Sequence, residues 1–194
     1  MEQISIFSAE ASAPSVADLA GVLCGQGQLA AFGRTAARLS VVVDEPWRAG
    51  LLAAECTLRG AAAQVARSDF GQPLVRTAFR KDLLGMATAW QPGAVKEVPP
   101  KFRLTGAALR MWALTGGRWI DGGYLLSLDE HAPETHPALA EAIRALGVAG
   151  ARLTGPGIKV AGRRRLAVLA ELIGRAPPGA EPAWPVSVPA RRAS

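Results

Sequence analysis

Acidic and histidine side chains are the first candidates for chemistry, and one short stretch, SLDEHAPETHP, gathers several of them. Its acids and histidines are Asp129, Glu130, His131, Glu134 and His136. Carboxylates and imidazoles at close spacing are typical metal ligands. The stretch nevertheless has the character of a loop leading into a helix, with Pro137 in the first turn. We therefore assign these residues a structural role and predict neither a metal ion nor a cofactor.

Basic side chains on predicted strands and at predicted helix starts form a second group of candidates. The strand-borne bases are Arg67, Arg76, Arg118, Arg152 and Lys159, and the helix-start bases are Arg80, Lys81, Arg163, Arg164 and Arg165. Bases at a helix N-terminus oppose the helix dipole, so a phosphate would stabilise them there. A solvated surface, or an acidic neighbour such as Asp82, would explain them as well. These residues are candidate DNA contacts, with solvated positions as the alternative.

Composition permits a polyanionic partner without requiring one. The chain has 194 residues, of which 49% are hydrophobic, and a formal net charge of +6. Cys24 and Cys56 each fall in a predicted helix, which favours buried small side chains over a disulfide or a zinc site. No apolar run approaches the roughly 20 residues that span a bilayer, and no secretory signal is evident. We expect a cytoplasmic protein without membrane association.

The elements that must position these residues follow from hydrophobic periodicity and turn signals. Helices are predicted at 15–26, 46–60, 80–91, 105–116, 136–147 and 163–174, and strands at 29–33, 38–43, 63–68, 74–79, 118–120, 124–129, 150–154 and 158–162. Ser15 and Asp18 form a capping box, and Asp44 is expected to cap the second helix. Residues 92–104 have the composition of a linker, and residues 176–194 are proline-rich and expected to be disordered.

The element order αββαββα occurs twice, which indicates an internal duplication. Laying repeat 1 (15–91) over repeat 2 (105–175) sets Gly27 against Gly117 and Gly60 against Gly147. The same alignment sets RKDLLGMA against RRRLAVLA. Residues 1–14 precede the first repeat as an N-terminal segment. A repeat of this length, drifting only at loops, predicts two copies of one supersecondary unit in the same domain.

Small residues on the first helix of each repeat suit a close approach of two helices. Ala17, Gly21 and Gly25 are spaced by four, and Ala113 precedes Gly117 by four. Residues at this spacing share one helix face, where the absence of large side chains lets backbones meet. With Gly27 and Leu109, these residues are the predicted helix interface.

The stretch LAGVLCGQGQL, residues 19–29, resembles the signature of LAGLIDADG homing endonucleases. Leu19, Ala20, Gly21 and Gly27 match by identity, and the second copy, LRMWALTGG, keeps chiefly Leu109 and Gly117. The resemblance implies an α+β fold, a pseudo-twofold duplication whose two signature helices pack side by side. It also implies two antiparallel sheets that form a saddle for DNA.

Cleavage in that family requires one carboxylate from each signature helix, placed before the last glycine, to hold metal ions against a phosphate. This sequence has Gln26 and Gly116 at those positions. Glutamine offers one neutral oxygen and glycine no side chain, so we predict no nuclease activity and no catalytic residue. An active magnesium nuclease remains a remote alternative.

Within the superfamily, the chain resembles the N-terminal domain of the WhiA regulators of sporulation and cell division, a catalytically inactive LAGLIDADG duplication. ADLAGVLCGQGQL, residues 17–29, and LRMWALTGGRWI, residues 109–120, carry the resemblance. It implies a regulatory domain acting through weak DNA binding or through a protein partner. WhiA continues into a helix-turn-helix domain and this sequence ends in a proline-rich tail, so a pure protein-interaction module is the alternative.

Overall fold

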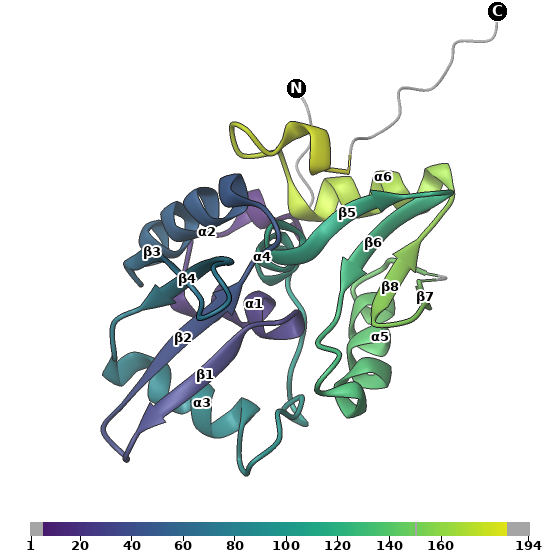
Figure 1. The fold of residues 1–194 in the computed structure, drawn as a ribbon. Coiled ribbons are helices and arrows are strands. Elements are labelled where there is room, and N and C mark those ends of the chain that lie inside the picture. The colour runs from purple at the N-terminus through teal and green to yellow at the C-terminus, as the bar shows by residue number, and fades with distance from the viewer. Residues whose placement is uncertain (1–5, 150, 186–194) are drawn as a thin grey trace, which may run out of the picture.

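The computed structural model describes residues 6–149 and 151–185 and contains the predicted element order in both repeats (Figure 1). Repeat 1 contains a 3-10 turn at Val16–Leu19, followed by α1 Ala20–Cys24, β1 Gln28–Phe32, β2 Ala36–Val42, α2 Pro46–Leu58, β3 Ala63–Arg67, β4 Pro73–Thr77 and α3 Leu84–Trp90. Repeat 2 contains α4 Gly106–Gly116, β5 Gly117–Ile120, β6 Gly123–Ser127, α5 His136–Ala145, β7 Arg152–Leu153, β8 Gly157–Val160 and α6 Arg163–Ile173. The α+β fold class predicted from the sequence is confirmed.

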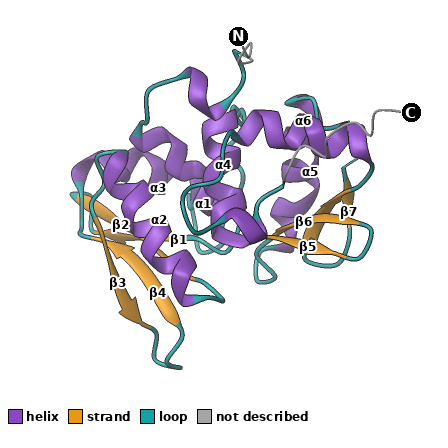
Figure 2. Ribbon diagram, turned by 90° about the horizontal axis from the view of Figure 1, so that it is seen from above, coloured by secondary structure: helices purple, strands orange, loops and turns teal. Residues whose placement is uncertain are grey.

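Each repeat forms one four-stranded antiparallel sheet with the same topology. The order is β1-β2-β4-β3 in sheet A and β5-β6-β8-β7 in sheet B, so the duplication extends to the strand connections. In sheet A, α2 contacts β3 and β4, and α3 contacts β1 and β2. In the view from above, the helices gather between and behind the sheets, whose strands fan out to either side (Figure 2). One face of each sheet therefore packs on helices, and no helix among the described residues covers the other face, which we call the uncovered face (Figure 2).

The first predicted helix begins as expected but is shorter than the periodicity suggested. Ser15 Oγ accepts a hydrogen bond from the Ala17 N–H at 3.1 Å, and the Asp18 carboxylate accepts one from the Ser15 N–H at 3.0 Å, so the capping box is confirmed. The helix stops at Cys24, because Gly25 leaves the helical conformation with φ −94° and ψ −140°. This early end exposes the carbonyls of the turn at residues 25–27 to partners from elsewhere in the chain.

The two signature helices, α1 and α4, pack against each other at the centre of the molecule. A Cβ on Gly21 would lie 1.7 Å from the Ala108 carbonyl oxygen, so only glycine permits this approach. A Cβ on Gly25 would lie 3.5 Å from Trp112 Cδ1 of α4, an ordinary contact distance. Leu109 and Ala113 of α4 are buried. The 3-10 turn contacts α4, but Ala17 itself is exposed there, so its predicted place in the interface is wrong.

The other two glycines of the predicted interface serve their own repeats. A Cβ on Gly27 would meet the Val22 carbonyl oxygen at 2.5 Å, within the turn that ends α1. A Cβ on Gly117 would meet the Tyr124 hydroxyl at 2.2 Å, at the pairing of β5 with β6. Both glycines allow the chain to leave the helix and enter the first strand, and neither mediates contact between the helices.

A largely buried ion-pair network also joins the repeats, near the N-terminal ends of α1 and α4. Arg59 pairs with both Asp18 and Glu55, and Glu55 accepts a hydrogen bond from Arg110 of α4 at 3.2 Å. Arg110 in turn donates to the Ile173 carbonyl at 3.0 Å. The network therefore links the first turn of repeat 1 to α2, α4 and the end of α6.

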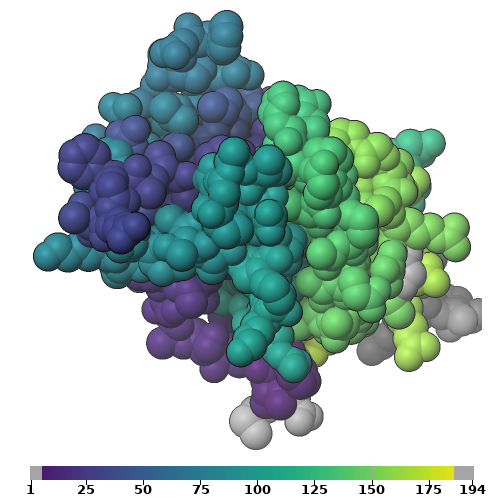
Figure 3. All heavy atoms as spheres, turned by 90° about the horizontal axis from the view of Figure 1, so that it is seen from below, coloured from purple at the N-terminus to yellow at the C-terminus, as the bar shows by residue number. Residues whose placement is uncertain are grey.

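The segment 92–104, which connects the repeats, lies in the seam between them. In the view from below, it forms a teal band between the purple and blue atoms of repeat 1 and the green atoms of repeat 2 (Figure 3). Lys96 and Leu104 within it are buried at 6% exposure each. The segment therefore contributes to the packing of both halves.

The predicted disorder of the tail from residue 176 is wrong for residues 176–185. Trp184 is 3% exposed, and its indole N–H donates to the Gly174 carbonyl at 2.9 Å. The Tyr124 hydroxyl donates to the Ala183 carbonyl at 2.9 Å. The buried Trp184 anchors the segment on repeat 2, whereas the prediction of disorder considered only the proline content. Residues 186–194 lie outside the described residues. In the described part of the chain, no helix is long and apolar enough to cross a membrane.

Candidate nucleic-acid interface

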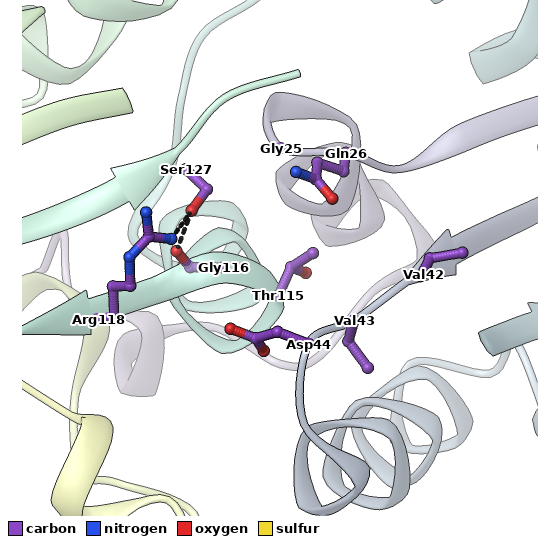
Figure 4. Close-up of a pocket in the computed structure, with 9 residues that line it drawn as sticks. All are labelled: Gly25, Gln26, Val42, Val43, Asp44, Thr115, Gly116, Arg118 and Ser127. Atoms are coloured by element: carbon purple, nitrogen blue, oxygen red, sulfur yellow. Dashed lines mark hydrogen bonds between the residues drawn. The ribbon is translucent and has the colours of Figure 1, made fainter. Parts of the chain in front are cut away.

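The two positions that would bear catalytic acids lie together in the structure. Gln26, in the turn after α1, and Gly116, the last residue of α4, line a small pocket of about 110 Å³ (Figure 4). The other lining residues are Gly25, Val42, Val43, Asp44, Thr115, Arg118 and Ser127. The pocket therefore opens where the ends of the signature helices meet the inner strands of both sheets.

The Gly116 position leaves little room for a side chain. A Cβ there would lie 2.9 Å from the Ser127 Cβ. The Ser127 hydroxyl donates to the Gly116 carbonyl at 2.8 Å and accepts from Arg118 at 2.7 Å. The pocket wall is thus built around a glycine, and Ser127 fills the space where a second acid would have to point.

Asp44 supplies a carboxylate to this pocket and faces a buried arginine. The expected capping of α2 by Asp44 is wrong, because Glu45 occupies the N-cap position. Asp44 Oδ1 lies 2.9 Å from Arg48 Nε as an ion pair. That Nε is buried and has no aligned hydrogen-bond acceptor in the described structure. The contact is therefore one of charge and proximity.

The Arg48 guanidinium binds the C-terminal end of the second signature helix. It donates to the carbonyls of Leu114, at 2.9 Å, and of Gly117. The Arg48 side chain is 4% exposed, whereas that of Asp44 is 57% exposed. A helix C-terminus carries unsatisfied carbonyls and partial negative charge, so a cation from repeat 1 here stabilises the end of α4 in repeat 2.

Lys96 binds the carbonyls at the C-terminal end of α1, as Arg48 does at the end of α4. Its ammonium donates to the carbonyls of Gly25, at 2.8 Å, and Gly27, at 3.1 Å, and pairs with Asp129 at 2.7 Å. Gln28 donates its side-chain amide to the same Asp129 oxygen at 2.6 Å. Both members of the pair are almost fully buried, at 5% and 4% side-chain exposure.

The pKa values of this pair reflect burial and mutual attraction. Burial lowers the pKa of the Lys96 ammonium, and the hydrogen bond and charge of Asp129 offset this only in part. Burial alone would raise the pKa of the Asp129 carboxyl. The hydrogen bond and charge of Lys96 outweigh that effect, with help from the His131 N–H and the Gln28 amide, so the pKa of Asp129 lies below its usual value. Asp129 is therefore held as a carboxylate.

The two arrangements are related by the duplication. Asp44 lies two residues after β2 and Asp129 two residues after β6, the corresponding strand of repeat 2. Each carboxylate pairs with a buried cation that binds the carbonyls of a signature helix. Sequence reasoning missed both cations, since Arg48 looked like an ordinary helix residue and Lys96 lay in a proline-rich linker. The repeated acid after the second strand was the one available signal.

The histidine-containing stretch has a structural role. A ring nitrogen of His136, Nε2, lies 2.7 Å from the Asp129 carbonyl oxygen, and His131 is exposed beside Glu130 at 3.8 Å. Within the described ranges, no three histidine, cysteine or acidic side chains gather as a metal site. Cys24 and Cys56 are buried and unpaired, and burial raises the pKa of the Cys56 thiol to about 12.

Three of the predicted basic contacts fall in one row across sheet B. The strand register places Arg118 opposite Leu125, Leu125 opposite Lys159, and Lys159 opposite Arg152. Opposed residues share one face of a sheet. The neighbouring row, with Leu126 and Ile158 at 0% exposure, faces the helices. The basic row therefore lies on the face without helices.

The remaining basic candidates are dispersed. Arg76 is exposed on the uncovered face of sheet A, opposite Ser40. Arg67 lies on the core-facing side of β3 and donates to the Gly71 carbonyl at 2.8 Å. Arg80 pairs with Asp82, 2.9 Å between Nε and Oδ1, which raises the pKa of the arginine and lowers that of the acid. Lys81 and the helix-start residues Arg163, Arg164 and Arg165 are exposed.

Two sheets of identical topology around a glycine-mediated helix pair define a duplicated, LAGLIDADG-like α+β domain. No protein-family model matches this chain, and no curated protein matches it. Among solved structures, it is similar to the homing endonuclease I-WcaI bound to its DNA recognition sequence, with a TM-score of 0.57 and 11% identity. The match covers 89% of this chain and 83% of that chain. This likeness shows a homing-endonuclease-like fold.

Proposed function

We propose that this chain is a non-catalytic LAGLIDADG-like domain that binds duplex DNA, mainly through backbone phosphates. The observation that carries the proposal is the row of Arg118, Lys159 and Arg152 on the uncovered face of sheet B. The similar I-WcaI structure is a DNA complex, and the net charge of +6 favours a polyanionic partner. By its resemblance to the WhiA regulators, the domain acts in transcriptional or developmental regulation.

The proposed lack of cleavage rests on the pocket between the signature helices. Metal-assisted phosphodiester hydrolysis needs carboxylates that hold divalent ions beside the scissile phosphate. Gln26 and Gly116 supply none, and Asp44, the one acid lining this pocket, is paired with Arg48. Lys96 donates to carbonyls at the C-terminal end of α1, and Arg48 donates to carbonyls at the C-terminal end of α4. The positive charge beside these carbonyls therefore comes from protein side chains.

A duplex titration tests the proposal. We expect fluorescence anisotropy with a labelled duplex to show binding that weakens steeply as NaCl rises from about 50 to 200 mM. Replacing Arg118 and Arg152 with glutamine reduces the slope of log K against log salt by about two, one for each phosphate contact. The matched control is Arg67→Gln, on the other face of its sheet, and it leaves the slope unchanged.

Two results would contradict the proposal. If binding at low salt is absent, DNA is not the partner, and the protein-interaction alternative remains. If specific cleavage occurs with Mg²⁺ and disappears on chelation, the domain is a nuclease and the assignment of Gln26 and Gly116 to the acid positions is wrong.

A further inference from the structure

The uncovered faces of the two sheets carry equivalent rows of different chemistry. In sheet A the strand register aligns Gln28, Ser40, Arg76 and Gln64 across all four strands, and we term these the repeat-1 row. In sheet B it aligns Arg118, Leu125, Lys159 and Arg152, the repeat-2 row. Both rows begin at the residue after the glycine that ends the signature motif and cross the strands in the same order. They are therefore counterparts under the duplication.

The repeat-1 row has the side chains that read base edges. A glutamine amide both donates and accepts, which matches the N6 and N7 atoms of adenine, and arginine matches O6 and N7 of guanine. Gln64 and Arg76 are exposed on neighbouring strands, directly opposite each other. Ser40, beside Arg76, adds a hydroxyl that donates or accepts. The row can thus present a pattern of donors and acceptors to a major groove.

The repeat-2 row has the side chains that suit phosphates. Arginine and lysine offer donors only, and Leu125, 7% exposed between them, offers no polar group. Two of the cations are also held in place: Arg118 donates to the Ser127 hydroxyl at 2.7 Å, and Lys159 donates to the Asp121 carbonyl at 2.8 Å. Cations held to the protein in this way suit phosphate oxygens, which a duplex of any sequence presents.

The β1–β2 hairpin of repeat 1 and the β5–β6 hairpin of repeat 2 also differ in the side chains that they could present to bases. The β1–β2 hairpin is longer than β5–β6 and reaches to the lower left in Figure 1, away from repeat 2. Near its tip Phe32 and Phe79 are 67% and 43% exposed, with ring centroids 5.6 Å apart, and Arg38 lies over the Phe79 ring. Exposed phenylalanine can contact the methyl group of thymine. The short turn of repeat 2, at Asp121 and Gly122, has no aromatic side chain.

We propose that the two repeats divide DNA recognition between them, repeat 1 reading base sequence and repeat 2 clamping the phosphate backbone. This inference rests on the proposed DNA-binding function. It assigns Gln64 and Arg76 as specificity residues, and Lys159 and Arg152 as affinity residues. A protein with this division selects a motif under one half of its footprint and tolerates any sequence under the other half.

Selection from a randomised duplex pool, followed by titration of variants, tests the division. The wild-type chain enriches one block of conserved base pairs. For the variant Gln64→Ala/Arg76→Ala, affinity for the selected duplex falls roughly 10- to 100-fold while affinity for a scrambled duplex changes little. For the matched variant Arg152→Gln/Lys159→Gln, affinity for both duplexes falls by the same factor, the salt slope drops by about two, and selection returns the same motif.

Other outcomes overturn the inference and separate it from the function on which it rests. If the wild-type chain binds DNA but selects no motif, or if Arg152→Gln/Lys159→Gln changes the motif, the division of roles is wrong and DNA binding stands. If the wild-type chain binds no duplex at low salt, both proposals fail. Because all four substituted residues lie on the uncovered sheet faces, circular dichroism spectra that match the wild type confirm that the variants fold.

Discussion

Asp129 and Asp44 are counterparts in the duplication but differ in burial, so their loss has different consequences. The Asp129 side chain is 4% exposed against a buried lysine, whereas that of Asp44 is 57% exposed. We predict that Asp129→Asn lowers the free energy of unfolding by about 3–5 kcal/mol, because it leaves the Lys96 charge buried without a counterion. The matched Asp44→Asn costs less than about 1 kcal/mol, since the Asp44 carboxylate is exposed to solvent and Arg48 keeps its hydrogen bonds to the Leu114 and Gly117 carbonyls. Urea unfolding measures the free energy of unfolding of both variants. Equal losses would contradict the inference that the burial of the Lys96–Asp129 pair sets its contribution to stability.

The same pair predicts an acid-sensitive stability. The pKa of Asp129 is lowered in the folded state, chiefly by Lys96 against the opposing effect of burial. Below the ordinary carboxyl pKa, near 4, the unfolded chain therefore binds a proton that the folded chain does not, and stability falls as pH decreases. Urea midpoints measured from pH 6 down to about pH 2.5 should fall more steeply for the wild type than for Asp129→Asn. Parallel curves would show that the pair contributes nothing to acid unfolding.

At the residue scale the sequence could predict which residues stand at the ends of the two helices, but not which cations bind there. Two short motifs align Gln26 and Gly116 with the acid positions of the homing endonucleases, and both residues line one pocket. Lys96 could not be found this way, because its partners Gly25 and Asp129 lie far from it in sequence. Only the folded chain shows that this linker residue caps a helix.

At the scale of elements, the contact of α1 with α4 depends on one glycine. Because a Cβ on Gly21 would lie 1.7 Å from the Ala108 backbone oxygen, both helices would have to move apart. We predict that Gly21→Ala destabilises the fold by about 3 kcal/mol or more. Gly50 of α2 is the control, since its Cβ would meet nothing within 4 Å, and Gly50→Ala should stabilise by about 0.5–1 kcal/mol. Thermal unfolding of both variants checks the contrast, and a neutral Gly21→Ala would refute the close approach.

Elements were predictable where periodicity was strong and not where tertiary contacts decided their ends. The helix predicted at 15–26 becomes a 3-10 turn and a short α1, because Gly25 turns out of the helix and its carbonyl binds Lys96. For the C-terminal tail, the sequence predicted too little structure. Its prolines indicated disorder, but Trp184 fills a site on repeat 2 that sequence composition could not reveal.

At the scale of the whole molecule, the duplication was the most informative signal in the sequence. It predicted two copies of one supersecondary unit, and the two sheets have the same strand order. It did not predict how each half completes the other. Arg48 of repeat 1 binds carbonyls at the end of α4, and Glu55 of repeat 1 accepts from Arg110 of repeat 2.

This mutual dependence predicts that the repeats unfold together. Leu19 of repeat 1 and Leu109 and Trp112 of repeat 2 are all 0% exposed, so neither repeat could lose its partner without exposing core residues. Urea unfolding followed by tryptophan fluorescence and by circular dichroism should therefore give coincident midpoints, and Asp129→Asn should shift both equally. Two resolved transitions would show that the halves are independent domains, and that contacts such as that of Arg48 with α4 do not couple them.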